Sequence, residues 1–392
     1  MHEAVIVSAV RTPIGRFNGM LSALDATDLG GIAIREAVRR AGIQPERVDE
    51  AIVGQVLPCG CGQNPARQAA LKAGLPVEVQ CLTVNKVCGS GLKAAMLAAQ
   101  AIQTGDAEVV VAGGMESMTR APYYLDKARF GYRMGAGQVQ DHMIHDGLWD
   151  TVNDFHMGLS NELCSERYRI SREEQDRYAE RSYHRALAAQ AEGLFRDEIV
   201  PIALSQLRGE TKVLDRDECP RETSFEILSG MAPVFKKDGT TTAGNASAIS
   251  DGAAAVVVMS REKADSLGCR AIAAIGSQAS AGTDMKYALA APILAIPKCL
   301  AKEKIGLSQI DLVEINEAFS GSTCAIIREL DLNPEKTNIH GGSVALGHPL
   351  GASGCRILVT LLHAMIRKNA RTGLASLCLG GGEAVAMIVH AR

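Results

Sequence analysis

Short apolar runs alternate along the chain with longer segments in which apolar residues recur at helical spacing. The runs are rich in Val, Ile and Ala and lie at residues 4–10, 51–56, 108–114, 253–260 and 312–316. Alternation of this kind predicts an α/β fold in which helices cover the sheet. Because most runs are apolar at successive positions, we expect both faces of the sheet to be buried.

The two ends of the chain carry similar patterns. Each half shows a helix end, a turn and a strand, then a glycine-rich entry to a helix, and later a Gly-Gly pair near a Glu. The matching pieces are 42–53 with 306–315, 89–91 with 352–354, and 113–116 with 381–383. Two similar βα halves are the simplest explanation of this internal similarity, and chance similarity between α/β units is the alternative.

The segment between the halves differs in composition and in its residue pattern. Residues 121–246 hold most of the aromatic residues, the only Trp and a long charged helical pattern that starts at Ser171. Ser171 and Glu174 fit a capping box at the start of that helix. We therefore expect an inserted loop domain at 121–246, an N-terminal half at 1–120 that residues 247–270 complete, and a C-terminal half at 271–392.

Composition narrows the class of protein. Of the 392 residues 47% are hydrophobic and 22% charged, with a net charge of −3, so no basic field is expected to hold nucleic acid or an anionic membrane. The longest apolar stretch, Ala253–Met259, is far shorter than the ~20 residues of a bilayer span. The N-terminus does not read as a signal peptide, since Glu3 interrupts it.

Cysteine usage points to a reducing compartment. The eleven cysteines are an odd number without a regular framework, which favours free thiols and a cytoplasmic location. Cys59-Gly-Cys61 resembles half of a metal site but has no second half nearby. The sequence therefore predicts no metal, and chance or packing is the simpler interpretation of this pair.

Cys88 is the first candidate for chemistry. It precedes Gly89-Ser90-Gly91 and an Ala-rich helical pattern that ends at Gly105. The free N–H groups and positive dipole end of a helix N-terminus favour a thiolate, and such placement can lower a thiol pKa well below the free value of ~8.5. A small buried residue at a strand-to-helix turn explains the same pattern equally well.

His348 lies in a segment too rich in glycine for a regular element. It stands between Gly347 and Pro349, just before a helix expected from about Ala352. A backbone this constrained suits an imidazole that serves as base for a thiol. An unremarkable loop histidine is the alternative, and a phosphate loop lacks the required Lys-Ser/Thr pair.

Two further motifs follow predicted strands. The run 373–384 predicts a β-hairpin with Cys378 near its turn, where a cysteine is usually a packing residue. The internal similarity of the two halves predicts that Cys378 lies near their shared centre, where Cys88 is also expected. Asn316 follows the strand 312–315, a favoured place for site residues in α/β folds.

Together these motifs resemble the thiolase family, of the acetyl-CoA acetyltransferase type. The resemblance rests on residues 85–91, 341–354 and 378–383 in order, with Asn316-Glu-Ala-Phe319 as a fourth motif, and it covers the whole chain. It implies a thiolase-like α/β fold: two similar halves with mixed sheets covered by helices, plus an inserted loop domain.

The resemblance also implies a two-step exchange of acetyl groups between CoA thioesters. Cys88 would become acylated after His348 takes its proton, and Cys378 would act as the second acid and base. One oxyanion hole would combine His348 with a water held by Asn316, and the other would use the N–H groups of Cys88 and Gly380. Such donors stabilise charge that develops on oxygen.

By the same resemblance the inserted domain receives CoA. The implied binding residues are Leu148, His156, Met157, Phe235, Ser247, Ala318 and Phe319. Acetyl-CoA, acetoacetyl-CoA and CoA are then the substrates, no further cofactor is implied, and a homotetramer is expected. The run Tyr287–Pro292 and the Pro220-Arg221 pair depart from the family pattern, so Arg221 is not among the expected binding residues.

Other functions compete with this interpretation. A 3-ketoacyl-CoA thiolase of broader chain length is the nearest, although His156-Met157 resembles the short-chain type. A cysteine hydrolase would not need Cys378, and a non-catalytic CoA- or lipid-binding protein would not need the full set of reactive groups. A decarboxylating ketosynthase would be expected to use two histidines, where this chain has His348 and Asn316.

Overall fold

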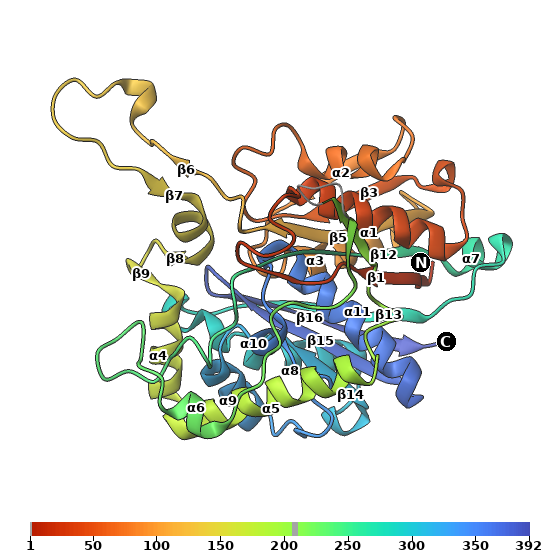
Figure 1. Ribbon diagram of the computed structural model, residues 1–392. Coiled ribbons are helices and arrows are strands. Elements are labelled where there is room, and N and C mark those ends of the chain that lie inside the picture. The colour runs from red at the N-terminus through yellow and green to blue at the C-terminus, as the bar shows by residue number, and fades with distance from the viewer. Residues whose placement is uncertain (1, 206–210) are drawn as a thin grey trace.

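The polypeptide folds around mixed β-structure with helices on both sides and between its two halves (Figure 1). We describe residues 2–205 and 211–392 of a computed structural model. The apolar runs became strands, as predicted, and their residues are buried along the whole length of most of them. The strands of the first half are, in sheet order, β4 (Gln80–Val84), β3 (Glu50–Gly54), β5 (Val109–Ser117), β12 (Ser250–Ser260) and β1 (Ala4–Arg11), with β2 (Gly15–Arg16) beside β12.

The second half repeats this order. Its strands are β13 (Ala273–Gly282), β16 (Glu383–Ala391), β15 (Thr372–Leu379) and β14 (Leu312–Ile315). Counted outward from the junction of the halves, the first three strands of each half pair antiparallel. The strands beyond them pair in parallel. Even the edge position of β4 has a counterpart, because Thr337 makes an isolated parallel bridge to Val313 of β14. The halves join through a short antiparallel contact between β1 and β13.

Helices form three layers around the two halves of the sheet. The outer layer of the first half holds α1 (Ala26–Ala41) and α2 (Pro65–Ala73), and the outer layer of the second half holds α8 (Pro292–Glu303) and α9 (Ser320–Glu329). Between the halves lie α3 (Ser90–Thr104) and α11 (Leu350–Lys368), which pack against each other. The layers place the starts of α3 and α11 at the centre of the molecule.

Close packing of α3 on α11 depends on small residues. A Cβ added at Gly354 would lie 2.4 Å from the backbone nitrogen of Leu92, so only glycine permits this approach. Among the described residues α11 is the one helix long and apolar enough to cross a membrane, but 83% of its apolar window is buried inside the protein. It is a core helix of this fold.

The segment predicted as an insertion wraps around one end of both halves. It contains α4 (Met157–Arg167), α5 (Arg172–Ala191) and α6 (Phe225–Ser229), and Ser171 with Glu174 forms the predicted capping box. Its hairpin of β6 (Tyr123–Tyr124) and β7 (Gln140–Asp141) projects away from the body (Figure 1). The remaining elements are β8 (Trp149–Asp150), β9 (Phe155–His156), β10 (Ile202–Ser205), β11 (Thr211–Leu214), α7 (Arg261–Leu267), α10 (Ser343–Leu346), the π-helix η3 (Met143–Leu148) and the 3-10 helices η1 (Pro45–Arg47), η2 (Ala128–Phe130), η4 (Met285–Ala290) and η5 (Leu307–Gln309).

Candidate active site

Cys88 occupies a strained turn between β4 and α3. The preceding residue, Val87, has φ 46°, a left-handed conformation that is unfavourable for a β-branched residue. The Ser90 hydroxyl holds the turn, because it donates to the Val87 carbonyl at 2.6 Å and accepts from the Lys86 N–H at 2.8 Å. The turn leaves Cys88 half-buried at the start of the helix, facing a cavity.

His348 is held by its backbone on one side and by its ring on the other. Gly347 before it has φ 102°, and a Cβ there would lie 2.2 Å from the Ser250 hydroxyl oxygen, so glycine is required. The His348 N–H donates to the Ala248 carbonyl at 3.0 Å. With 6% of its surface exposed, the imidazole has little freedom to move.

A serine sets the tautomer of this histidine. The Ser353 hydroxyl donates to the Pro349 carbonyl at 2.8 Å, so its oxygen is free to accept from Nδ1–H of His348 at 2.6 Å. Nε2 then carries the free lone pair. Burial, with a smaller effect of the Arg356 charge, lowers the pKa of His348 to about 3, so the imidazole is neutral and can accept a proton at Nε2.

Asn316 meets His348 from the end of β14. Its Nδ2 lies 3.4 Å from Nε2 of His348, and its Oδ1 accepts from the Ser343 hydroxyl at 2.6 Å. Asn316 is buried, with 1% of its surface exposed. The sequence placed this residue near a site only through the strand that precedes it, whereas the fold brings it to the base nitrogen of His348.

The predicted β-hairpin exists and carries Cys378 and Gly380. Cys378 pairs with Ala384 one step before the turn between β15 and β16. Its thiol is buried in an apolar cluster that also contains Met157, and the pKa of Cys378 is raised by burial, with a smaller contribution from the nearby Cys88 thiol. Gly380 in the turn directs its N–H at the Cys88 sulfur.

The helix N-terminus does not lower the pKa of Cys88 below its free value. Burial raises the pKa of its thiol to about 11, and the Glu116 carboxylate adds to this in a minor way. The N–H groups of Gly380 and Cys88 act in the opposite direction but do not outweigh the loss of solvent. The helix N-terminus was the correct location, but the sequence could not reveal how little water reaches it. At neutral pH Cys88 and His348 are therefore a neutral thiol and a neutral imidazole.

One cavity of about 400 Å³ collects almost all of the predicted site residues. Asn316 and Cys378 lie just behind its wall and are the exceptions. The predicted residues that line it are Cys88, Leu148, His156, Met157, Phe235, Ser247, Ala318, Phe319, His348 and Gly380. The cavity thus brings together residues from both halves and from the segment between them.

The sequence missed several lining residues. They are Met118, Gly147, Val234, Ala243, Ala246, Ala248, Ile249, Leu289 and Leu350. Val234 and Leu350 stand next to predicted residues or inside a quoted motif, so adjacency was a usable signal for them. Met118 and Ile249 carry no motif, because an apolar side chain in a cavity wall has the same sequence pattern as one in the core.

Comparisons with known proteins agree along the full chain. Residues 4–262 match the family Thiolase, N-terminal domain, and residues 269–391 match Thiolase, C-terminal domain. The chain belongs to the thiolase family. An acetyl-CoA acetyltransferase of Pseudomonas aeruginosa is 53% identical over 388 residues, with 99% of each chain covered. One of Cupriavidus necator is 51% identical over 393 residues, with both chains fully covered.

Solved thiolase-family structures share the fold closely. The crystal structure of a Bacillus anthracis acetyl-CoA acetyltransferase superposes with a TM-score of 0.98 at 44% identity, covering 100% of this chain and 99% of that one. The first part of the thiolase match covers the first half together with the inserted segment, and the second part covers the second half. The predicted boundaries of the inserted domain stay a prediction.

In this thiolase-family chain much of the cavity wall is an irregular segment. We call residues 231–249 the wall segment; it supplies Phe235 and Ser247 and ends at β12. Phe235 stacks on His156 with ring centres 4.7 Å apart and meets Phe319 edge-on at 6.2 Å. The Ser247 N–H donates to the Ala318 carbonyl at 3.0 Å. These contacts close one side of the cavity.

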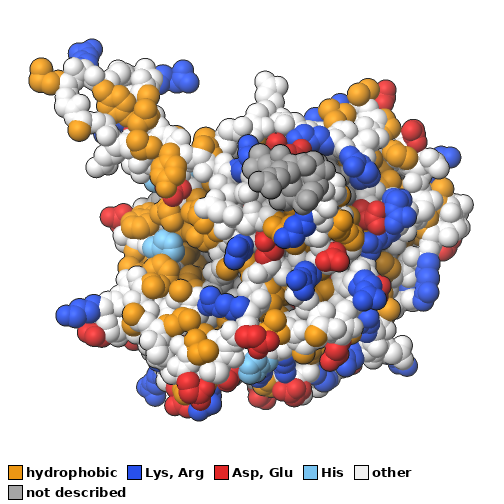
Figure 2. Space-filling view, in the orientation of Figure 1, with side chains coloured by type: hydrophobic (Ala, Val, Ile, Leu, Met, Phe, Trp, Pro, Cys, Tyr) orange, Lys and Arg blue, Asp and Glu red, His pale blue; other side chains and the backbone are white. Residues whose placement is uncertain are grey.

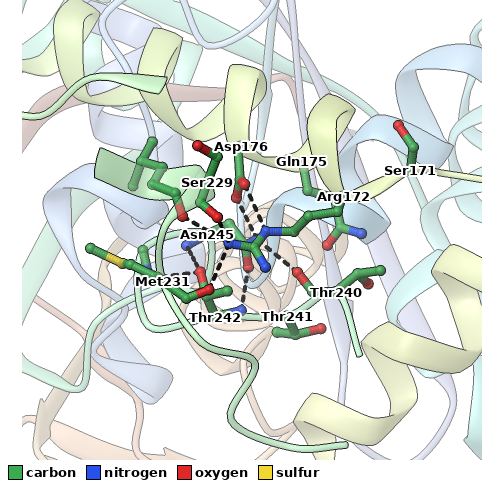
Figure 3. A network of polar contacts seen from close by, with 12 residues as sticks. Ser171, Arg172, Gln175, Asp176, Ser229, Met231, Thr240, Thr241, Thr242 and Asn245 are labelled. Carbon is green, nitrogen blue, oxygen red and sulfur yellow. Dashed lines mark hydrogen bonds and ion pairs between the residues drawn. The ribbon is translucent and has the colours of Figure 1, made fainter. Parts of the chain in front are cut away.

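A polar network ties the wall segment to α5 (Figure 3). Arg172 donates through Nη2 to the carbonyls of Leu228 at 2.8 Å and Met231 at 2.9 Å, and through Nε to the Asp176 carboxylate at 2.6 Å. The other Asp176 oxygen accepts from Nδ2 of Asn245 at 2.9 Å. Because Asp176 is fully buried, these donors replace the hydrogen bonds that its carboxylate would make with water.

The two departures from the thiolase pattern have defined surroundings. Tyr287 lies under the Arg167 guanidinium, 4.4 Å from ring centre to Cζ, and Leu289 from the same run lines the cavity. Arg221 stacks over Tyr183 at 5.5 Å and is not a lining residue. Within residues 2–205 and 211–392, no group of three or more His, Cys, Asp or Glu could hold a metal ion.

Proposed function

We propose that the protein interconverts two acetyl-CoA with acetoacetyl-CoA and CoA through an acetyl group carried on Cys88. The acetyltransferase function follows from full-length relatives of that name at about half identity. The observation that carries the mechanism is the shared cavity, in which Cys88, His348 and the Gly380 N–H meet beneath an apolar wall.

In the first step Cys88 attacks the thioester carbonyl of acetyl-CoA while His348 takes the thiol proton at Nε2. The sulfur of CoA leaves and receives a proton from Cys378, so Cys378 becomes a thiolate and His348 keeps the proton of Cys88 at Nε2. Because the resting pair is neutral, proton transfer accompanies attack instead of preceding it. The N–H groups of Cys88 and Gly380 stabilise the oxyanion of the tetrahedral intermediate.

In the second step the Cys378 thiolate removes the α-proton of a second acetyl-CoA. The Nε2–H of protonated His348, with a water held by Asn316, stabilises the enolate oxygen. The enolate attacks the acetyl group on Cys88, a carbon–carbon bond forms, and the Cys88 sulfur leaves and takes its proton back from Nε2 of His348. The position of Cys378 behind the cavity, beside Met157 and opposite Cys88, supports this division of labour.

The cavity wall receives the acyl and pantetheine parts of CoA. We assign this contact to Leu148, His156, Met157, Phe235, Ser247, Ala318 and Phe319, which line the cavity from three different parts of the chain. Most of these side chains are apolar, which favours a small uncharged acyl group. On this proposal residues 121–246 act as the CoA-binding domain.

The protein is proposed to be a cytoplasmic homotetramer. The projecting hairpin exposes apolar side chains that a second copy of the chain would cover (Figure 2). Among them are Phe130, 85% exposed, and Met134, 98% exposed. All eleven cysteines are free thiols, which fits a reducing compartment. Sedimentation of the intact protein tests the assembly, and a monomer at micromolar concentration would contradict it.

Mass spectrometry after incubation with acetyl-CoA tests the chemistry. We expect an acetyl adduct on Cys88 that is absent from the Cys88→Ser variant. A wild-type protein that never acquires this adduct would overturn the proposal. Thiolysis rates for acetoacetyl-CoA and 3-ketohexadecanoyl-CoA then test the substrate range, and faster turnover of the long chain would favour the broader thiolase activity.

A further inference from the structure

We propose that Arg356 and Ser343 are positioning residues for the carbon–carbon step, because they determine which end of the Asn316 carboxamide faces His348. The inference rests on the proposed function, since it assigns a partner to a group within that reaction. It concerns a buried line of polar contacts that runs from the core helix α11 to the base nitrogen of the catalytic histidine.

The line joins four side chains from separate elements. Arg356 of α11 donates from Nη2 to the Ser343 hydroxyl oxygen at 2.8 Å, and the Ser343 hydroxyl donates to Oδ1 of Asn316 at 2.6 Å. Nδ2 of Asn316 then lies 3.4 Å from Nε2 of His348. Arg356 and Ser343 are almost fully buried, with 1% and 0% of their surfaces exposed.

The donors and acceptors along this line allow only one arrangement of its hydrogen bonds. A guanidinium only donates, so the Ser343 oxygen accepts from Arg356 and its single proton goes to Asn316. That proton selects Oδ1, which turns Nδ2 toward His348. Without it the carboxamide is free to rotate by half a turn, because its oxygen and nitrogen ends have nearly the same shape. The rotated amide would offer an acceptor where the reaction needs a donor.

A purely structural role does not explain this arginine. Within the described part of the chain, Nε and Nη1 of Arg356 have no hydrogen-bond partner. Its ion pair with Glu314 is long, at 3.7 Å between Nη1 and Oε2, and that oxygen also lacks a hydrogen bond. Buried charges that are retained for stability normally have their hydrogen bonds satisfied. Among the described residues, the one hydrogen bond of the Arg356 side chain leads to the active site.

Two half-reactions separate positioning from general damage. Exchange of labelled CoA into acetyl-CoA reports acylation of Cys88, whereas condensation of acetyl-CoA also needs the donor on Asn316. For Ser343→Ala and Arg356→Met we expect condensation to slow about tenfold or more, as for other losses of oxyanion stabilisation. We expect exchange and the KM for acetyl-CoA to stay within about threefold, a change of under 1 kcal/mol.

Ser8→Ala is the matched control. The Ser8 hydroxyl is equally buried, at 2% exposure, and has no hydrogen-bond partner among the described residues. We expect this variant to condense acetyl-CoA as the wild type does. Ser343→Thr keeps the hydroxyl and should recover most of the activity lost in Ser343→Ala, which keeps the test informative if Arg356→Met does not fold.

The double variant Ser343→Ala with Arg356→Met completes the experiment. If Arg356 acts through Ser343, the second substitution adds little to the first. Condensation by Ser343→Ala at the rate of Ser8→Ala would overturn the inference, as would equal losses in exchange and condensation. A wild type that lacks the acetyl adduct on Cys88 would instead overturn the proposed function, so the two failures are distinguishable.

Discussion

The catalytic centre and the wall segment share one cavity but are held in place by different forces. Cys88 and His348 precede the two core helices, and Cys378 ends a central strand, so close packing of the layers fixes all three. The wall segment has little regular structure, and the Arg172–Asp176–Asn245 network anchors it (Figure 3).

The difference follows from what each region must do. A reacting atom that moves by about 1 Å can lose about a hundredfold in rate, which close-packed elements prevent. A wall that binds pantetheine needs to exclude water and fit the shape of its ligand. Hydrogen bonds at the ends of the wall segment are enough to hold it for that purpose. Changes in the centre should therefore alter kcat, and changes in the ties should alter KM.

The largest effect expected from this comparison is at Cys378. Cys378→Ala should slow the carbon–carbon step by about a thousandfold, the typical contribution of an acid–base group. The acetyl adduct on Cys88 should still form and be visible by mass spectrometry. Cys299→Ala is the control, because that cysteine is as buried but packs on the outer side of the second half. An active Cys378→Ala variant would contradict the mechanism.

The pH dependence of alkylation probes the burial of Cys88. A thiolate fraction rises tenfold per pH unit below its pKa, and the pKa of Cys88 is raised to about 11. The rate of its reaction with iodoacetamide, followed by peptide mapping, should therefore rise about a thousandfold from pH 7 to pH 10 without levelling off. A plateau near pH 8 would mean that the helix terminus prevails over burial.

Gly347→Ala should damage the centre through the backbone. The φ of 102° is unfavourable for alanine and the Cβ would collide with Ser250, so His348 has to shift. We expect kcat to fall about a hundredfold. Gly105→Ala is the matched control, because Gly105 also has a positive φ, 82°, but open space around it. It should lower the melting temperature without changing kcat.

The smallest effect is expected at the wall. Arg172→Met removes the charged tie to Asp176 and should raise the KM for acetyl-CoA by about tenfold, the equivalent of one or two hydrogen bonds. The kcat should change by less than about threefold. Arg177→Met is the control on the same helix, because the exposed Arg177 pairs with Glu173 and stacks over Phe225 without contacting the Arg172–Asp176–Asn245 network. Loss of kcat instead of KM would show that the wall also positions the chemistry.

Local patterns predicted the regular elements well, because each depends on nearby residues. The apolar runs became β1, β3, β5, β12 and β14, the capping box at Ser171 starts α5, and the hairpin turns after Cys378 as expected. The helix expected from Ala352 starts two residues earlier, at Leu350. The sequence similarity between the halves corresponds to the repeat of strand order.

The candidate site was predictable only where a motif marked it. Ser343, Ser353 and Arg356 lie in or just after a motif that drew notice for its glycines, yet nothing in the motif indicates which atoms their side chains contact. The lining residues Met118 and Ile249 have no local signal at all. Contacts between residues hundreds of positions apart are a property of the packed layers.

By itself the sequence determined the α/β alternation, the repeated halves, the special backbone around His348 and the identity of the reactive side chains. Those features depend on residue type and on neighbours within a few positions. The tertiary structure alone decided the protonation states, because the pKa values of Cys88 and His348 depend on how far the folded layers exclude water. It also decided that the line of polar contacts from Arg356, which is buried beneath the site, reaches Nε2 of His348.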